Sequence, residues 1–164
     1  ILMSGTLHSD NIIKNIFGIK DYATVNAEDL KFGSTEVVMT GLEFDCKYSN
    51  FTSKNHTREQ YLKALSSCIE KAEKPTLIHV HAFQDLPTDA EQVNLQSNII
   101  SSESLKRKQW EDKTGKDVSN FKKGLSDYLF STRCTRGVDF PGNTCKSIVF
   151  TKYPNPNVSD TFWN

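Results

Sequence analysis

One stretch decides how this chain folds and what it can bind: Ser131-Thr132-Arg133-Cys134-Thr135-Arg136-Gly137-Val138-Asp139-Phe140-Pro141-Gly142. It follows the apolar run Tyr128-Leu129-Phe130, which has the composition of a buried strand. Hydroxyls, arginines and a Gly-x-Asp step therefore begin where a strand ends. Ligands of open α/β sheets bind at the carboxyl ends of the strands. We therefore expect a ligand-binding loop from Ser131 onward.

The rest of the sequence alternates between apolar strands and amphipathic helices. Strands are predicted at residues 36–40, 76–80, 98–101, 125–132 and 146–151. Helices are predicted at residues 10–17, 57–72, 88–95, 105–113 and 117–123, and capping boxes open the second and third of them. The polar stretch 41–56 is predicted to be a loop. This alternation predicts an α/β fold, with a mostly parallel sheet covered by helices on both faces in three layers.

Length and composition suit one globular domain. The chain has 164 residues, of which 37% are hydrophobic and 24% are charged. It contains no targeting signal and no apolar run of the roughly 20 residues that a membrane-spanning helix requires. We therefore expect an intracellular protein, in the cytoplasm or in the nucleoid or nucleus, without a membrane partner. Ile1-Leu2-Met3 has the character of a strand already in progress, which predicts that the chain is a fragment.

The formal charge is zero, but the charges are unevenly distributed. Residues 106–146 hold ten Lys and Arg and five Asp and Glu, a local charge of +5 that the remainder of the chain balances. A basic sector of this kind is consistent with an edge that faces phosphates. A solvated helix face explains it equally well.

Residue types that often bind ligands are given structural roles here. The four cysteines form no Cys-x-x-Cys pair and are expected to be reduced packing residues. His79 and His81 lie two apart on a predicted strand, but no third ligand follows at a useful spacing, so no metal site is predicted. Trp110 and Trp163 are expected to be packing anchors.

Several pieces of the sequence, taken together, resemble a known family. The stretch 131–142 is similar to motif V of superfamily 2 helicases. Ser4-Gly5-Thr6-Leu7, the helix and strand unit at 57–83, and residues 127–157 occur in the order found in the second RecA-like domain of the XPD and DinG group of ATP-dependent DNA helicases. The match covers most of the chain, and the ordered set is more specific than any single piece.

The resemblance implies that residues 1–164 form a single RecA-like helicase C-terminal domain, truncated before motif VI. In the complete protein, a DNA repair helicase, ATP and Mg²⁺ would bind between this domain and the first RecA-like domain of the same polypeptide. Hydrolysis would drive translocation on single-stranded DNA and unwinding at a fork, with 5′ to 3′ polarity. Relatives often carry an iron-sulfur cluster, but its ligands belong to the other half and none are expected here.

The resemblance assigns nucleotide-binding roles to Gly137, Asp139 and Arg136. Glycine lets the backbone approach a ligand closely or adopt a positive φ, and Asp139 offers an acceptor for a ribose hydroxyl or a catalytic-site water. Relatives usually have an acid where this chain has Arg136, whose charge could reach a phosphate or pair with an acid of the partner domain. The alternative is a tight strand-to-helix turn with Asp139 as a local cap.

Nucleic-acid contacts are implied for two segments. The short donors and the cation that phosphate backbones require are supplied by Ser131, Thr132, Arg133 and Thr135. Phe83 occupies the aromatic position of motif IV, where it would stack on a base or pack in the core. His81-Ala82 replaces the usual proline and serine of that motif.

Ser4, Gly5 and Thr6 match motif III, which couples the two RecA-like halves. An ordinary strand-ending turn is the alternative for this short piece.

No complete catalytic site is present in the sequence. It lacks a Gly-x-x-x-x-Gly-Lys-Ser/Thr loop and an Asp-Glu pair for Mg²⁺. It also lacks the arginines of motif VI, and loss of an arginine finger costs factors of about 10³ to 10⁵ in comparable enzymes. We therefore expect no ATP hydrolysis by this chain alone. Two alternatives stay open: a RecA-like nucleic-acid-binding or assembly module without ATPase coupling, and a small Rossmann-like domain that serves an unrelated ligand.

Overall fold

A computed structural model describes residues 10–23, 34, 36–37, 45–95, 97–134 and 137–152. The chain divides into two units, residues 1–43 and 44–164, which are described separately. In the first unit, α1 (Asp10–Asn15) occupies the predicted position of the first helix. Gly18 beyond its end has φ +66°, a left-handed conformation that suits glycine. Most of the strand predicted at 36–40 lies outside the described residues, as do Ser4, Gly5 and Thr6.

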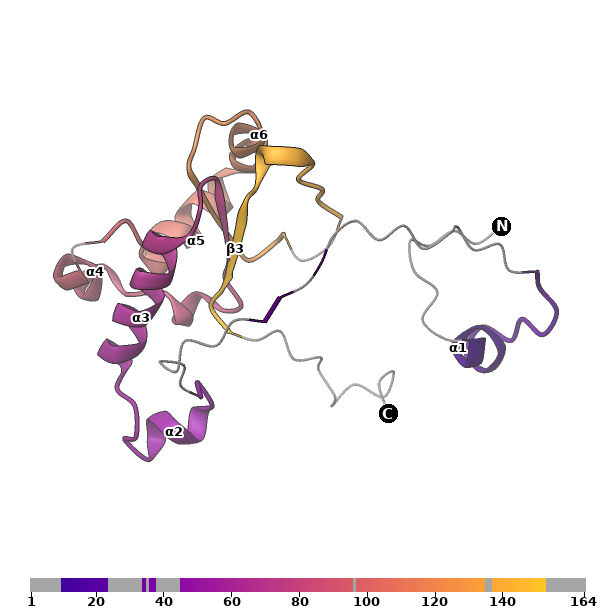
Figure 1. Ribbon diagram of the computed structural model, residues 1–164, viewed down its shortest axis with the longest axis horizontal. Coiled ribbons are helices and arrows are strands. Elements are labelled where there is room, and N and C mark those ends of the chain that lie inside the picture. Colours follow the sequence, from indigo (N-terminus) through magenta and orange to yellow (C-terminus); the bar gives the residue numbers. More distant parts are fainter. Residues whose placement is uncertain are drawn as a thin grey trace. The chain divides into compact units, whose positions relative to one another are not determined.

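The second unit alternates helices and strands along the chain (Figure 1). Its helices are α2 (Tyr48–Thr52), α3 (Arg58–Lys71), α4 (Asp89–Leu95), α5 (Ser102–Glu111) and α6 (Lys116–Lys122). Its strands are β1 (Thr76–His79), β2 (Tyr128–Ser131) and β3 (Ser147–Phe150), and the single-turn helices are η1 (Phe83–Asp85) and η2 (Gly142–Thr144).

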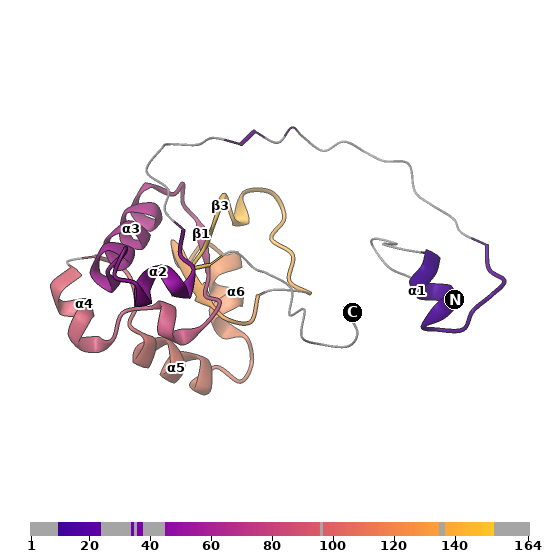
Figure 2. The same ribbon diagram turned by 90° about the horizontal axis from the view of Figure 1, so that it is seen from below.

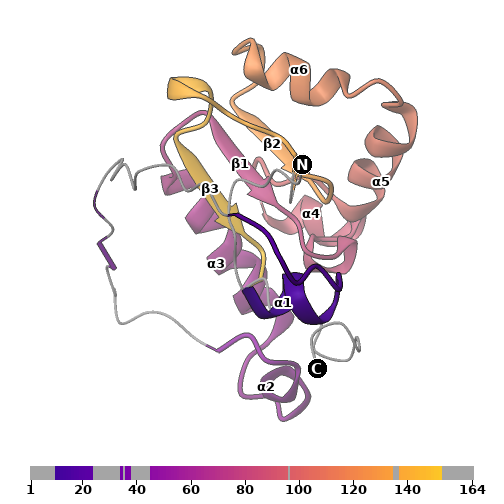
Figure 3. The same ribbon diagram turned by 90° about the vertical axis from the view of Figure 1, so that its right-hand side faces the viewer.

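The three strands form a parallel sheet in the order β2-β1-β3, with β1 in the centre (Figure 3). The register aligns Ile78 of β1 with Phe130 of β2 and Val149 of β3. Strands this close in space and this far apart in sequence need crossover connections, which α4, α5 and α6 supply between β1 and β2.

Helices cover both faces of the sheet, as Figure 2 shows for α3 and α6. On one face, Ile78 and Val80 pack against apolar residues of α3 and against Leu105 of α5. On the other face, Leu77 and Leu129 pack against Phe121 of α6. This is the predicted α/β fold in three layers, consistent with a RecA-like layout, and the described part of the sheet has three strands.

The two predicted capping boxes are confirmed. The Thr57 hydroxyl accepts a hydrogen bond from Gln60 N, and the Gln60 side chain accepts one from Thr57 N at 2.9 Å. Glu91 and Thr88 exchange the equivalent bonds at the start of α4. Glu91 also receives two bonds from the Arg58 guanidinium, at 2.7 and 3.1 Å. These bonds lower the pKa of Glu91 to about 2.

Three sequence expectations differ from the observed elements. Residues 98–101 form no strand, because the segment instead leads into α5, where Ser101 caps the helix by accepting from Ser104 N. The stretch 41–56, predicted as loop, contains α2. The strand predicted at 125–132 begins only at Tyr128. Leu125 N still bonds the Asn120 carbonyl at the end of α6, and Gly124 has φ +71°.

Among the residues that the structure describes, no helix combines the length and the apolar composition needed to cross a lipid bilayer.

The sheet interior predicts a contrast between two isoleucines on neighbouring strands. Ile78 is fully buried, whereas Ile148 is 54% exposed. Ile78→Ala should lower the free energy of unfolding by about 2–5 kcal/mol because it leaves a cavity. The matched Ile148→Ala should cost less than about 1 kcal/mol, the span of strand propensities. Urea unfolding followed by circular dichroism measures both, and equal losses would contradict the assigned register.

Candidate functional site

The carboxyl ends of the three strands converge one residue beyond the ladder. Val80 N donates to the Ser131 carbonyl at 2.9 Å, and Thr151 N donates to the His79 carbonyl at 3.1 Å. The polar segments that follow β1, β2 and β3 therefore start side by side. This is the edge where open α/β sheets bind ligands.

The last residue of β2 and the residue that follows it turn their hydroxyls inward. Ser131 is buried, and its Oγ accepts a hydrogen bond from Arg133 N at 3.0 Å. Thr132 is half-buried and donates to Gln109 Oε1 of α5 at 2.8 Å. The Arg133 side chain is exposed. Of these predicted phosphate contacts, Arg133 is thus the most accessible, and Thr135 lies outside the described residues, as does Arg136.

The second half of the loop presents an exposed carboxylate next to an anchored ring. Gly137 has φ +72°, a conformation in which a side chain would be strained. Asp139 is exposed. The next residue, Phe140, packs edge-to-face against Phe121 of α6, with ring centres 5.6 Å apart. The anchor fixes the backbone on which Asp139 is carried, so the carboxylate faces solvent from a defined position.

Phe83 lies in η1, directly after β1. Its ring is half-buried and packs against the core cluster that includes Ile78 and Leu105. The Lys106 ammonium of α5 lies 5.5 Å from the ring centre. Phe83 therefore both packs in the core and shows part of its ring beside a cation.

A buried carboxylate that the sequence reading missed ties the strand ends together. Asp85 Oδ2 accepts from Ala82 N and from the Thr151 hydroxyl, both at 3.0 Å, and Lys152 Nζ lies 2.6 Å from its Oδ1. The Thr151 hydroxyl also accepts from His81 N at 2.9 Å. Both carboxylate oxygens of Asp85 therefore have partners within the chain. This indicates that Asp85 stabilises the fold and is not available to a ligand. The only sequence signal is an acid three residues after Ala82, in the position that bonds back to the start of a helical turn.

Two buried side chains near the end of the sheet have polar atoms without a hydrogen-bond partner in the described part of the chain. They are His79, at both ring nitrogens, and Gln109, at Nε2. Such groups each cost about 1–3 kcal/mol when left unsatisfied, so native structures seldom keep them without a reason. Burial, assisted by the charge of nearby His81, lowers the pKa of His79.

The sheet face that carries His79 is partly open. The His79 ring lies 5.3 Å from the ring of Phe150 on β3. Phe150 is 48% exposed, and Ile148 on the same face is also exposed. Within the described residues, α6 covers Leu77 and Leu129 and leaves these two apolar side chains of β3 in contact with solvent.

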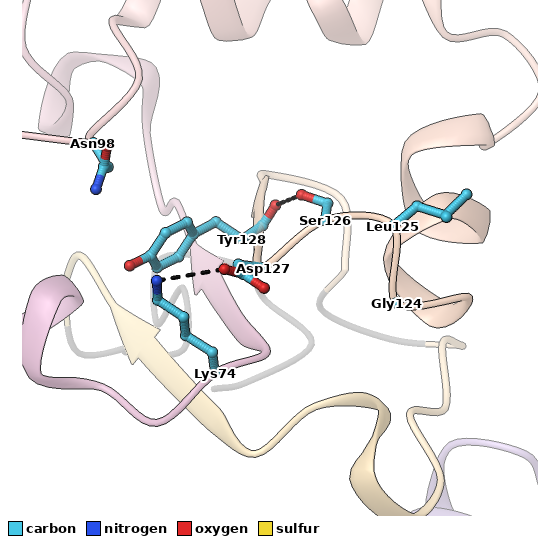
Figure 4. A pocket seen from close by; sticks show the side chains of 7 residues that line it. All are labelled: Lys74, Asn98, Gly124, Leu125, Ser126, Asp127 and Tyr128. Atoms are coloured by element: carbon cyan, nitrogen blue, oxygen red, sulfur yellow. Dashed lines mark hydrogen bonds and ion pairs between the residues drawn. The ribbon is translucent and has the colours of Figure 1, made fainter.

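A hollow lies at the opposite edge of the sheet, where β1 and β2 begin (Figure 4). It is an open depression of about 610 Å³ beside Lys74, Asn98 and residues 124–128. Lys74 Nζ lies 3.4 Å from an oxygen of Asp127 and 5.0 Å from the centre of the Tyr128 ring. Its charge is therefore already paired, and none of the predicted site residues lines this hollow.

Among the described residues, no three His, Cys, Asp or Glu side chains are grouped so that they could hold a metal ion. Comparison of the chain with protein families, with curated proteins and with solved structures found no match in any of the three.

The buried histidine predicts an acid-sensitive contribution to stability. The folded state binds fewer protons at His79 than the unfolded state, whose pKa is near 6.5. The free energy of unfolding should therefore fall as the pH drops below that value and level off above it. His79→Phe should reduce this loss, measured by urea unfolding at about pH 7.5 and about pH 5.5. His81→Phe replaces an exposed ring and removes only the secondary effect of its charge on His79, so it should reduce the loss less than His79→Phe does. Identical behaviour of both variants would refute the assignment.

Proposed function

We propose that this chain is the second motor domain of an ATP-dependent DNA helicase of the XPD and DinG type, inactive alone. One observation carries the proposal. The segment with the residue order of motif V leaves the carboxyl end of β2 beside the central strand, and it exposes Arg133, Gly137 and Asp139 at that edge. That placement suits a loop that contacts a nucleotide on one side and a nucleic-acid backbone on the other.

The residues fit one wall of a nucleotide cleft. Asp139 is an exposed acceptor on a fixed backbone, and the positive φ of Gly137 leaves room for a close approach. Bound ATP with Mg²⁺ would supply the free energy of phosphoryl transfer. The groups that cradle phosphates and hold the metal would come from the first RecA-like domain of the same polypeptide. On this side, Asp139 would orient a ribose hydroxyl or a water.

The same loop has a mechanical connection to α5. The Thr132 hydroxyl bonds Gln109 of α5, while Ser131 holds the turn to Arg133. If the loop shifts when the two domains close, these two bonds would move both α5 and Arg133 with it. The Arg133 guanidinium would contact the phosphate backbone of a single DNA strand. Repeated closure and opening would move that contact along the strand.

The proposal predicts that Asp139 controls ATP turnover. In the complete polypeptide that contains this chain, Asp139→Ala should lower DNA-stimulated ATP hydrolysis by roughly 100-fold, as loss of a positioning group does. Asp127→Ala is the matched control, because Asp127 is an exposed acid at the opposite end of β2. A steady-state phosphate-release assay with single-stranded DNA measures both. Unchanged turnover of the Asp139 variant would refute its role, and a wild-type polypeptide without DNA-stimulated hydrolysis would refute the function.

The proposal also predicts weak nucleotide binding by the 164-residue chain itself. One wall of a cleft cannot enclose the phosphates, so isothermal titration calorimetry with Mg·ATP should give no saturable heat. Tight, stoichiometric binding would contradict a cleft shared between two domains. It would instead favour a self-contained nucleotide site.

A further inference from the structure

A row of paired aromatic rings and cations runs from the end of β1 along α5. Lys106 Nζ lies 5.5 Å from the Phe83 ring centre, and Lys113 Nζ lies 4.1 Å from the Trp110 ring centre. Trp110 is 74% exposed, so its expected role as a packing anchor is wrong. Trp163 lies outside the described residues. A large indole held in solvent beneath an ammonium group has no role in the core.

Helix geometry gathers these side chains on one surface. Lys106 and Arg107 precede Trp110 by four and three residues, so all three neighbour one another on α5. The buried side of the helix is occupied by Ser102, Leu105 and Gln109. We call the surface formed by Phe83, Lys106, Arg107, Trp110 and Lys113 the α5 track.

The cations of the α5 track form no direct ion pairs with the acids that the structure describes nearby. Within the described part of the chain, Lys106, Arg107 and Lys113 form no ion pair. Asp112 accepts hydrogen bonds from the backbone N–H groups of residues 114, 116 and 117, in the turn that leads into α6 and in its first two residues. Glu103 is likewise engaged, by Asp89 N and the Ser102 hydroxyl. Glu111 is an exposed acid beside the track. Over residues 103–113, four cations (Lys106, Arg107, Lys108 and Lys113) outnumber three acids (Glu103, Glu111 and Asp112) by one, and the cationic groups of the track stay free to contact phosphates.

We propose that the α5 track binds single-stranded nucleic acid, with a base stacked on Trp110 and the backbone phosphates contacted by Lys106, Arg107 and Lys113. Proteins that bind single strands without sequence preference combine exposed aromatic rings with cations. Every base offers a face that can stack on a ring, and every nucleotide carries a phosphate charge that a cation can contact. The free positive charge selects a polyanion over an apolar partner. Phe83 forms the end of the track nearest the sheet.

The track is connected to the loop after β2. Gln109 precedes Trp110, and its Oε1 receives the Thr132 hydroxyl at 2.8 Å. A nucleic-acid strand bound on the outer side of α5 would therefore contact the same helix to which Thr132 of the Ser131–Asp139 loop is hydrogen-bonded. The binding itself needs neither ATP nor a second domain, so this inference goes beyond the motor function and can stand without it.

Affinity for a fluorescein-labelled oligothymidylate, measured by fluorescence anisotropy with the 164-residue chain, tests the track. Trp110→Ala should weaken binding by roughly 5- to 150-fold, the range observed for loss of one stacked base. Trp110→Phe should keep most of the affinity because the ring is retained. Val93→Ala is the matched control, since Val93 is 79% exposed on α4. The exposure of Trp110 means that thermal unfolding of all three variants should match the wild type.

The cations are tested by salt dependence. Lys113→Gln should reduce the slope of log affinity against log salt by about 0.7, the value for one phosphate contact on a single strand. Lys71→Gln, an exposed lysine of α3, should leave the slope unchanged. Wild-type affinity in Trp110→Ala, or an unchanged slope in Lys113→Gln, would overturn the proposal.

Self-association is the other outcome that the track allows. A wild-type chain that binds no oligothymidylate, but forms a dimer that Trp110→Ala abolishes in sedimentation, would make the surface a protein interface and would also overturn the proposal. Neither result bears on Asp139 and ATP turnover. Failure of the track and failure of the motor function are therefore distinguishable.

Discussion

The pairing of β1 on both of its edges is the constraint on which the rest of the structure depends. Its amides and carbonyls bond β2 on one side and β3 on the other, and the bonding extends beyond the strand to Val80 and Thr151. Its side chains are buried along its whole length. A strand enclosed in this way can neither shift its register nor turn over without exposing apolar surface. The positions of the loops at both ends of the sheet follow from this one strand.

Asp85 connects the segments that follow β1 and β3 at the carboxyl edge of the sheet. It lies after β1 but bonds Thr151 and Lys152, which follow β3. The Tyr61 hydroxyl of α3 donates to the Thr151 carbonyl at 3.1 Å and so brings a helix into the same network. A buried charge is favourable only when its oxygens are fully bonded, and here they are. The edge that carries the candidate site is thus held by polar bonds as well as by the apolar core beneath it.

Sequence reasoning succeeded where the signal was local. Thr57 and Thr88 predict the starts of their helices because their capping hydrogen bonds are made with residues only three positions away. The composition of the apolar runs in β1 and β3 likewise predicts that they are strands. Residues 98–101 also contain an apolar pair, Ile99 and Ile100, but they end in Ser101, which caps α5, and have no strand beside them in the described structure. What decided that segment was its tertiary neighbourhood, which composition does not encode.

The candidate site shows the same division. The sequence identified the polar loop after β2 and the strand end that carries it, because both follow from the order of residues along the chain. It could not identify the inward turn of Thr132 toward Gln109, which joins residues 23 positions apart. Nor could it identify the exposure of Trp110, since an indole on a helix is more often buried. Asp85 was missed for the same reason, because two of its partners follow a strand more than sixty residues away.

The outer margin of β3 has a consequence of its own. In the described sheet this strand pairs only with β1, and Ile148 and Phe150 stand in water on one of its faces. A row of unpaired amides and carbonyls beside apolar side chains templates the addition of a further strand. Natural proteins blunt such margins with charged residues, proline or a covering segment, and Ser147–Phe150 contains neither a charge nor a proline. Within the described residues, the outer margin of β3 therefore offers backbone donors and acceptors to which a further strand can pair.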